Sequence, residues 1–245
     1  MIGEVHAEDF ESVERAINSV NADVVVNCIG VVKQDESAKN PIVSITVNSL
    51  FPHRVAQAVQ NTRGRLIHLS TDCVYSGRRG YYSETDVADA EDLYGRSKLL
   101  GEVLGEQCLT FRTSMIGREL DGSHGLLEWF LSQSGVVPGF KRAVFSGFTT
   151  TALASLIAEV IDHHSQLNGL WHVAADPITK FDLLTLVKQT YELKTEIEPD
   201  DTFACDRSLN GTRFRETTGI EPPSWSKMIE ELRADPTPYE EIRKQ

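Results

Sequence analysis

The sequence predicts an α/β fold, in which a doubly wound parallel sheet carries a smaller C-terminal lobe. Apolar runs typical of buried strands alternate along the chain with segments whose apolar residues recur at helical spacing. Strand and helix alternating in this way indicate parallel strands joined by right-handed crossover helices. With 245 residues, the chain can form one sizeable core, or one domain and a smaller lobe.

The first third of the chain predicts a helix, a strand and a second helix. Phe10, Val13, Ile17 and Val20 recur at helical spacing, which predicts a surface helix. The segment 23–29 is a nearly unbroken apolar run, so it predicts a strand that is buried on both faces. The next helix has one apolar side, which consists of Val47, Leu50, Phe51, Val55, Ala58 and Val59.

The same alternation continues through the middle of the chain. It predicts strands over 65–70, 109–113 and 170–174, and helices over 91–107 and 151–163. After Ser114 the pattern loosens: glycines punctuate 115–148, and 176–245 is acidic with helices expected near 180–192 and 224–233. We expect these two stretches to form the lobe at the carboxyl ends of the strands, where open α/β sheets bind ligands.

Charge and cysteine content narrow the class of protein. The chain has 24 basic and 36 acidic residues, a net charge of −12, which argues against nucleic acid and against an anionic membrane as partners. No apolar run could span a bilayer, and the first residues lack a signal-peptide pattern. Cys28, Cys73 and Cys108 lie in or beside apolar runs, which predicts reduced core thiols of a cytoplasmic protein. No group of residues has the spacing of a metal site.

Tyr94 and Lys98 are the strongest candidates for catalysis. They are four residues apart in a predicted helix, so both side chains project from one helix face. A free tyrosine titrates near ~10, and a neighbouring lysine cation is expected to lower that pKa. Thr71 follows the predicted strand 65–70 and could add a hydroxyl to the same carbonyl oxygen. These groups could protonate an alkoxide while a hydride reaches carbon, although a bare Tyr-x-x-x-Lys pair also occurs by chance.

The surroundings of this pair resemble a known family. The segments Leu69–Gly77, Tyr82–Asp86 and Tyr94–Glu102 resemble the extended short-chain dehydrogenase/reductases, and most closely their dTDP-4-dehydrorhamnose reductase branch. The likeness runs from about Phe10 to Leu232. It implies a Rossmann-like cofactor domain over 1–118 and 146–175, and a substrate lobe over 119–145 and 176–245.

The resemblance also implies an activity. NADPH or NADH would deliver hydride to C4 of a nucleotide-linked 4-keto-6-deoxy sugar, in the cytoplasm, for dTDP-rhamnose and cell-surface polysaccharide synthesis. Tyr94 would protonate the oxygen, Lys98 would tune Tyr94 and hold the ribose, and Thr71 would polarise the carbonyl. A homodimer is compatible with the resemblance.

Binding residues follow from the same resemblance. Tyr94 and Lys98 would contact the cofactor, together with Asn27, Cys28, Ile29, Gly30, Val31 and Leu69; the alternative for the first five is a plain strand end, with Asn27 capping a loop. Thr71 and Tyr94 would contact the substrate, together with Asp72, Met115 and Arg207. Asp72 could instead cap its loop, and Arg207 could instead form a surface ion pair.

Two positions depart from the family pattern. Met115 stands where these reductases usually have Trp, and Cys73 where they usually have Tyr, so the sugar could differ from dTDP-4-dehydrorhamnose. The related sugar dehydratases carry a Glu at the position of Cys73, which disfavours dehydration. Two alternatives stay open: a sugar-nucleotide epimerase, and a non-catalytic subunit resembling the regulatory subunit of methionine adenosyltransferase.

The N-terminal segment also departs from the family pattern. A dinucleotide fold normally opens with a strand, a Gly-rich turn and a helix that receives the pyrophosphate, and no such turn precedes Asn27. Gly77-Arg78-Arg79-Gly80 is expected to be a solvent turn. We therefore expect that the chain as given is truncated at its N-terminus, lacks the first strand, glycine loop and second strand, and binds dinucleotide weakly.

Overall fold

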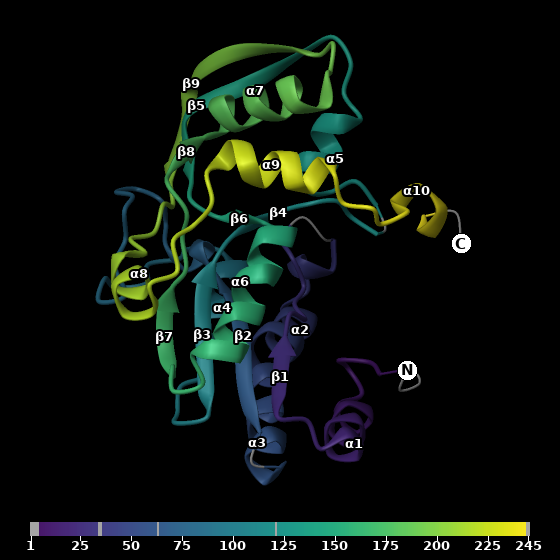
Figure 1. Cartoon of the computed structure of the whole chain (residues 1–245), viewed down its shortest axis with the longest axis vertical. Helices are drawn as coiled ribbons and strands as arrows, with labels where there is room; N and C mark the ends of the chain where they lie inside the picture. The colour runs from purple at the N-terminus through teal and green to yellow at the C-terminus, as the bar shows by residue number, and fades with distance from the viewer. Residues whose placement is uncertain (1–4, 34–35, 63, 121, 244–245) are drawn as a thin grey trace. The chain divides into compact units, whose positions relative to one another are not determined.

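The computed structural model describes residues 5–33, 36–62, 64–120 and 122–243. The chain forms two compact units, each made of several segments (Figure 1). The first unit contains 1–76, 84–112 and 164–172. The second contains 77–83, 113–163 and 173–245.

The first unit is built on a four-stranded sheet. Its strands lie in the order β1-β2-β3-β7, and β1 pairs in parallel with β2, as β3 does with β7. The strands span Val24–Asn27 (β1), Arg65–Thr71 (β2), Cys108–Thr113 (β3) and Gly169–His172 (β7). The predicted parallel sheet is thus confirmed, with each strand close to its expected position.

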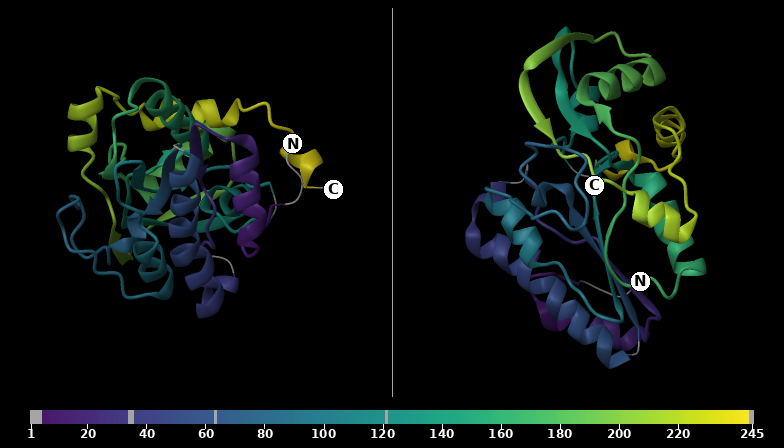
Figure 2. Two further views of the ribbon diagram at one scale, coloured as in Figure 1. Left: turned by 90° about the horizontal axis from the view of Figure 1, so that it is seen from below. Right: turned by 90° about the vertical axis from the view of Figure 1, so that its left-hand side faces the viewer.

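Helices of the first unit gather on one face of this sheet (Figure 2). α3 (Phe51–Thr62) packs on β1 and β2, and α1 (Phe10–Val20) packs on α3. Their apolar stripes form one core cluster with the start of β2, which explains the helical spacing of these residues: Val13, Ile17, Phe51, Val55, Ala56, Ala58, Val59 and Leu66. α4 (Leu93–Leu100) packs on β2 as well.

A π-helical turn precedes α3. The short helix α2 (Pro41–Ser44) runs into a π-helix at Ile45–Leu50, which continues as α3. A π-turn holds more residues than an α-turn, so it shifts the phase of the side chains that follow. As a result Asn48 is fully buried while Leu50 is 44% exposed. The expectation that Leu50 lies on the buried side is wrong for this reason.

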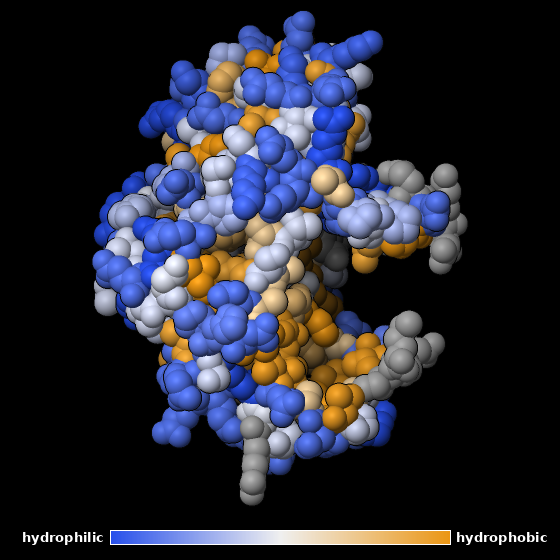
Figure 3. Space-filling view, in the orientation of Figure 1, coloured by the Kyte–Doolittle hydropathy of each residue, from blue (hydrophilic) through white to orange (hydrophobic). Residues whose placement is uncertain are grey.

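The sequence predicted strand β1, but its burial is lower than expected. Val26 is 37% exposed, because β1 is the end strand of the described sheet and pairs with β2 alone. Val20 of α1 is exposed as well, and Figure 3 shows apolar side chains at the surface over this part of the chain. The prediction that this strand is buried on both faces is therefore wrong.

The cysteines are free thiols, as expected, but only one is a core residue. Cys108 is buried, Cys73 is half-buried and Cys28 is exposed. Cys28 directly follows β1, where the chain leaves the sheet, so its side chain is outside the core. The description of Cys28 and Cys73 as core thiols is therefore wrong.

The second unit contains two small sheets. β4 (Met115–Ile116) pairs with β6 (Phe148–Thr149), and the other sheet has the order β8-β5-β9. Its long strands, β5 (Val136–Phe145) and β9 (Glu196–Asp206), pair in parallel. The sequence did not predict either of them, because glycine and proline interrupt β5 and acidic residues dominate β9.

Helices of the second unit pack on this sheet and on one another. α7 (Lys180–Tyr191) packs on β5, and α9 (Trp225–Arg233) packs on α7 and on α6 (Thr150–His163). The sequence predicted all three of these helices. Three shorter helices complete the unit: α5 (Leu126–Leu131), α8 (Thr212–Thr218) and α10 (Tyr239–Ile242). Across the described parts of both units, no helix has the length and apolar character needed to cross a membrane.

Helix α4 ends earlier than expected, at Leu100 rather than at 107, because of a close backbone contact. A Cβ atom on Gly101 would lie 1.9 Å from the Asn48 carbonyl oxygen. Only glycine therefore allows the end of α4 to touch the π-helical turn.

We predict that Gly101→Ala destabilises the protein by about 1–3 kcal/mol, because the added methyl group overlaps backbone atoms that cannot move without disturbing the π-turn. Urea denaturation measures the change in free energy of unfolding. Gln57→Ala, at an exposed position of α3, is the control and should stay within about 0.5 kcal/mol. A Gly101→Ala variant as stable as the wild type would contradict the proposed contact.

Candidate active site

Thr71 is fixed at the point where β2 ends. The chain turns there into a short 3-10 helix over Asp72–Val74. The Thr71 hydroxyl accepts a hydrogen bond from the Cys73 backbone N–H at 3.1 Å and donates to Asp72 Oδ1 at 3.3 Å. Both side chains are buried. Asp72 therefore orients the Thr71 hydroxyl, and this hydroxyl caps the turn.

Helix α4 begins where a carboxylate caps it. Asp92 Oδ1 accepts from the Gly95 N–H at 2.7 Å, and Asp92 Oδ2 pairs with Lys33 Nζ at 2.5 Å. A Cβ atom on Gly95 would lie 2.2 Å from the Cys73 carbonyl oxygen. Glycine at this position lets the first turn of α4 press against the turn that follows Thr71.

This contact brings Tyr94 next to Thr71. Burial of the phenol raises the pKa of Tyr94, the neighbouring Cys73 raises it further, and the nearby Thr71 hydroxyl lowers it by less. The net effect raises the pKa of Tyr94 well above its usual value. The expected net lowering of this pKa is not found in this structure, because desolvation dominates. Tyr94 therefore stays protonated at neutral pH, as a proton donor must.

Lys98 lies one turn further along α4, with its ammonium group at β2. Lys98 Nζ donates to the Leu69 carbonyl oxygen at 2.7 Å, and the residue is only 5% exposed. Burial lowers the pKa of Lys98 to about 8, while the carboxylate of Glu102, and then Cys28, act in the opposite direction. Lys98 is thus half charged near pH 8, within the range where enzymes work.

The loop after β1 lies over Lys98. Asn48 holds this loop, because its amide accepts from the Val31 N–H at 2.9 Å and donates to the Val31 carbonyl at 3.1 Å. Asn48 also donates to Ser97 Oγ on α4 at 3.2 Å. A Cβ atom on Gly30 would lie 3.3 Å from Asn48 Oδ1 and 3.6 Å from Lys98 Nζ. Gly30 therefore leaves space above the ammonium group that a side chain would fill.

The Asn27 side chain makes hydrogen bonds within the protein. Its Oδ1 accepts from the Ile29 N–H at 3.0 Å, so it caps the loop, and its Nδ2 contacts His68 Nδ1 at 3.1 Å. Cys28, Ile29 and Gly30 are exposed beside Lys98. The backbone of this loop can thus face a ligand, while the buried Asn27 side chain holds the loop in place.

His68 is a buried histidine of β2, and only one of its ring nitrogens is satisfied. Nδ1 bonds Asn27, whereas Nε2 has no partner among the described residues. Burial, and then the positive charge of Lys98, lower the pKa of His68 to about 3. His68 is therefore neutral at physiological pH.

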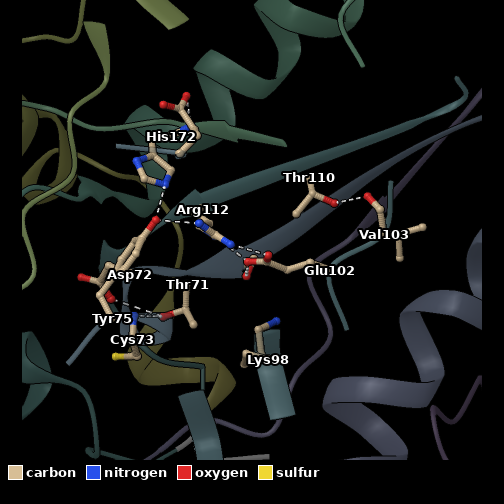
Figure 4. Close-up of polar contacts among 12 residues, drawn as sticks. Thr71, Asp72, Cys73, Tyr75, Lys98, Glu102, Val103, Thr110, Arg112 and His172 are labelled. Carbon is tan, nitrogen blue, oxygen red and sulfur yellow. Dashed lines mark hydrogen bonds and ion pairs between the residues drawn. The ribbon is translucent and has the colours of Figure 1, made fainter. Parts of the chain in front are cut away.

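A buried polar network lies beside the catalytic side chains (Figure 4). Arg112 of β3 forms two hydrogen bonds with the carboxylate of Glu102, each 2.7 Å long. Arg112 also donates to the Tyr75 hydroxyl at 2.6 Å, and that hydroxyl lies 3.2 Å from His172 Nε2. Sequence reasoning missed this network, because its members come from four different segments and only the fold brings them together.

Met115 and Arg207 belong to the second unit. Met115 is 46% exposed on β4, and the Arg207 N–H donates to the Val144 carbonyl at 3.4 Å. Their contact with substrate stays a prediction. The described residues contain no group of three or more His, Cys, Asp or Glu that could hold a metal ion.

Comparisons with known proteins agree with the fold and with the resemblance. The RmlD substrate binding domain family matches residues 3–236. A probable low-salt glycan biosynthesis reductase, Agl14 of Haloferax volcanii, is 30% identical over 183 residues, which are 70% of this chain and 60% of that protein. The chain thus spans less than two thirds of the length of this relative.

A second relative is matched over more of its length. The dTDP-4-dehydrorhamnose reductase of Aggregatibacter actinomycetemcomitans is 24% identical over 243 residues, 89% of this chain and 83% of that protein. Among solved structures, the dTDP-4-dehydrorhamnose reductase of Bacillus anthracis in complex with NADP superposes with a TM-score of 0.82 at 20% identity, over 95% of this chain and 87% of that one. These findings confirm the predicted family and its Rossmann-like fold.

We predict that stability falls as the pH drops from about 6.5 toward 3, because the unfolded chain protonates His68 while the folded chain does not. The effect of this group alone is on the order of 2 kcal/mol between pH 7 and pH 4.5. His68→Gln should flatten the pH dependence, as measured by urea denaturation at both pH values. His124→Gln, at an exposed histidine, should leave it unchanged, and equal slopes for the two variants would contradict the assignment.

Proposed function

Because the chain belongs to the RmlD substrate binding domain family, we propose that it is an NAD(P)H-dependent reductase of a nucleotide-linked 4-keto-6-deoxy sugar. The observation that carries this proposal is the Thr71–Tyr94–Lys98 arrangement. Thr71 lies close enough to Tyr94 to act on its pKa, and Lys98 lies buried one turn further along the helix that carries Tyr94. Thr71, Tyr94 and Lys98 thus provide a hydroxyl, a proton donor and a cation at the carboxyl end of β2.

Each of these residues has a separate task in the proposed reaction. Bound NADPH or NADH supplies the hydride to C4. Tyr94 stays protonated, because burial raises its pKa, so it can give its proton to the developing alkoxide. Thr71 donates its proton to Asp72 in this structure, and turning that proton toward the substrate oxygen would polarise the carbonyl. Lys98 supplies positive charge beside the phenol, which stabilises the phenolate left after proton transfer.

The loop after β1 fits the nicotinamide end of such a cofactor. Gly30 leaves space over Lys98 Nζ that a Cβ would occupy, and the exposed backbone of 28–30 borders it. Lys98 would reach the ribose hydroxyls, and Leu69 and Val31 would border the ring, as the family resemblance implies. Asn48 would keep this loop in place through its two hydrogen bonds to Val31.

The proposed substrate follows from the relatives. The Aggregatibacter relative is named for dTDP-4-dehydrorhamnose, and the Haloferax relative for glycan synthesis. We propose Asp72, Met115 and Arg207 as substrate contacts, and 119–145 with 176–245 as the substrate lobe. Cys73 lies close enough to act on Tyr94, so a small thiol borders the reacting carbonyl, and this favours a sugar that differs from dTDP-4-dehydrorhamnose.

We predict that Tyr94→Phe lowers turnover by roughly 10²–10⁴-fold, because it removes the proton donor. NADPH and NADH oxidation, measured with dTDP- and UDP-linked 4-keto-6-deoxy sugars, gives the rates. Tyr81→Phe removes the hydroxyl of an exposed tyrosine and should keep wild-type turnover. Near-normal turnover by Tyr94→Phe would end the assignment. Because the chain is expected to bind dinucleotide weakly, the wild type is also assayed at cofactor concentrations raised until the rate no longer increases, and no oxidation there with any of these sugars would count against the proposed function.

We also propose that the protein works in the cytoplasm as a homodimer. Large apolar side chains are exposed on the contacting helical segments, at Ile42, Ile45 and Leu100, and Leu104 is exposed in the loop shortly after α4, which favours association through these residues. Sedimentation equilibrium should show dimers for the wild type and monomers for Leu104→Glu. Val87→Glu, at another exposed apolar residue, should still dimerise. A monomeric wild type would refute the dimer.

A further inference from the structure

Glu102 is a buried carboxylate that the proposed reaction does not use. It directly follows the C-cap of α4, Gly101, and only 8% of its side chain is exposed. One oxygen accepts from Ser70 Oγ at 2.7 Å, and both accept from Arg112. A carboxylate in such a place carries a large desolvation cost unless its charge is compensated.

Glu102 and Lys98 reach neighbouring residues of β2. Lys98 donates to the carbonyl of Leu69, and Glu102 binds the hydroxyl of Ser70. The next residue along β2 is Thr71. The end of α4 is therefore attached to β2 at two adjacent points, just before the catalytic hydroxyl.

Glu102 also differs in charge from the other groups that act on Lys98. Cys28 follows β1, and although the residue is exposed, partial desolvation of its thiol raises the thiol pKa, so it is neutral at physiological pH. His68 of β2 is neutral as well, since its pKa is lowered to about 3. Tyr94 precedes Lys98 on α4 and stays protonated. In the part of the chain that the structure describes, Glu102 is thus the anion that acts on the Lys98 ammonium.

We propose that Glu102, held by Arg112, is a positioning residue that keeps Lys98 charged and seated at the end of β2. This inference rests on the proposed reductase function for its catalytic consequence. Arg112 fixes both carboxylate oxygens, so Glu102 cannot turn toward Lys98 and neutralise it by a direct ion pair. Its negative charge instead acts over a distance and offsets part of the desolvation of the ammonium group.

The test is the titration of Lys98 in the whole chain. The 13Cε resonance of Lys98, assigned by its loss in Lys98→Met, follows protonation without substrate or cofactor. Glu102→Gln removes the charge with little change in shape, and it should move the Lys98 titration down by about one pH unit. The alkaline limb of kcat/KM, which reports the free enzyme, should move down with it, while the rate at pH 6 falls much less.

Two control variants separate charge from packing. Glu102→Asp keeps the charge and should keep the Lys98 titration near that of the wild type, even if the shorter side chain lowers stability. Glu106→Gln removes an exposed carboxylate four residues further along the chain and should not move the titration. If Glu102 were merely structural, Glu102→Gln would lower the rate equally at all pH values and leave the Lys98 titration unchanged, which would overturn the proposal.

A further variant covers the case in which Glu102→Gln fails to fold, because it leaves Arg112 buried without its partner. Glu102→Gln/Arg112→Gln leaves no unpaired charge and should show a smaller downward shift, because loss of the Arg112 cation acts in the opposite direction. An unchanged or raised Lys98 titration would overturn the proposal. The titration is independent of turnover. A wild type without reductase activity would therefore refute the proposed function, whereas the resonance would still decide whether Glu102 acts on Lys98.

Discussion

The candidate site depends on one backbone contact, between the first turn of α4 and the turn that ends β2. Gly95 allows it, since any side chain there would overlap the Cys73 carbonyl. Through this contact Tyr94, from a helix, meets Thr71, from a strand. Asp92 caps the helix at the same place, so the helix start and the strand end hold each other. The proton donor is therefore positioned by rigid elements rather than by a free loop.

Electrostatics in this region follow from burial. Desolvation raises the pKa of Tyr94 and lowers that of Lys98, so each group is pushed toward its neutral form. A neutral phenol is suited to give a proton, whereas a neutral amine would be of little use beside a developing phenolate. Compensation therefore has to come from an anion, and Glu102 is placed to provide it. Arg112 in turn compensates the desolvation of the Glu102 carboxylate, because the two side chains form a buried ion pair.

The fold was largely predictable, because it follows from local periodicity. The strands β2 and β3 and the helices α1, α6, α7 and α9 all have apolar residues at the spacing their structure needs. Tyr94, Lys98 and Thr71 were found because they lie within one short part of the chain. The Arg112–Glu102 pair and the role of Asn48 were not predictable, since they depend on contacts between distant segments. The pKa of Tyr94 was mispredicted, because a sequence shows neighbours but not solvent exclusion.

The π-helical turn at Ile45–Leu50 lies within a continuous helical segment, between α2 and α3. The number of residues in this segment therefore decides which way its side chains point, as much as their identity does. Each residue turns an α-helix by about 100°, so deleting one residue here would convert the turn to regular α-helix and rotate everything before it. Asn48 would then leave the Gly30–Val31 loop, although no hydrogen-bonding side chain had been replaced. The position of Asn48 at the loop thus depends on the number of residues in this helix as well as on their identity.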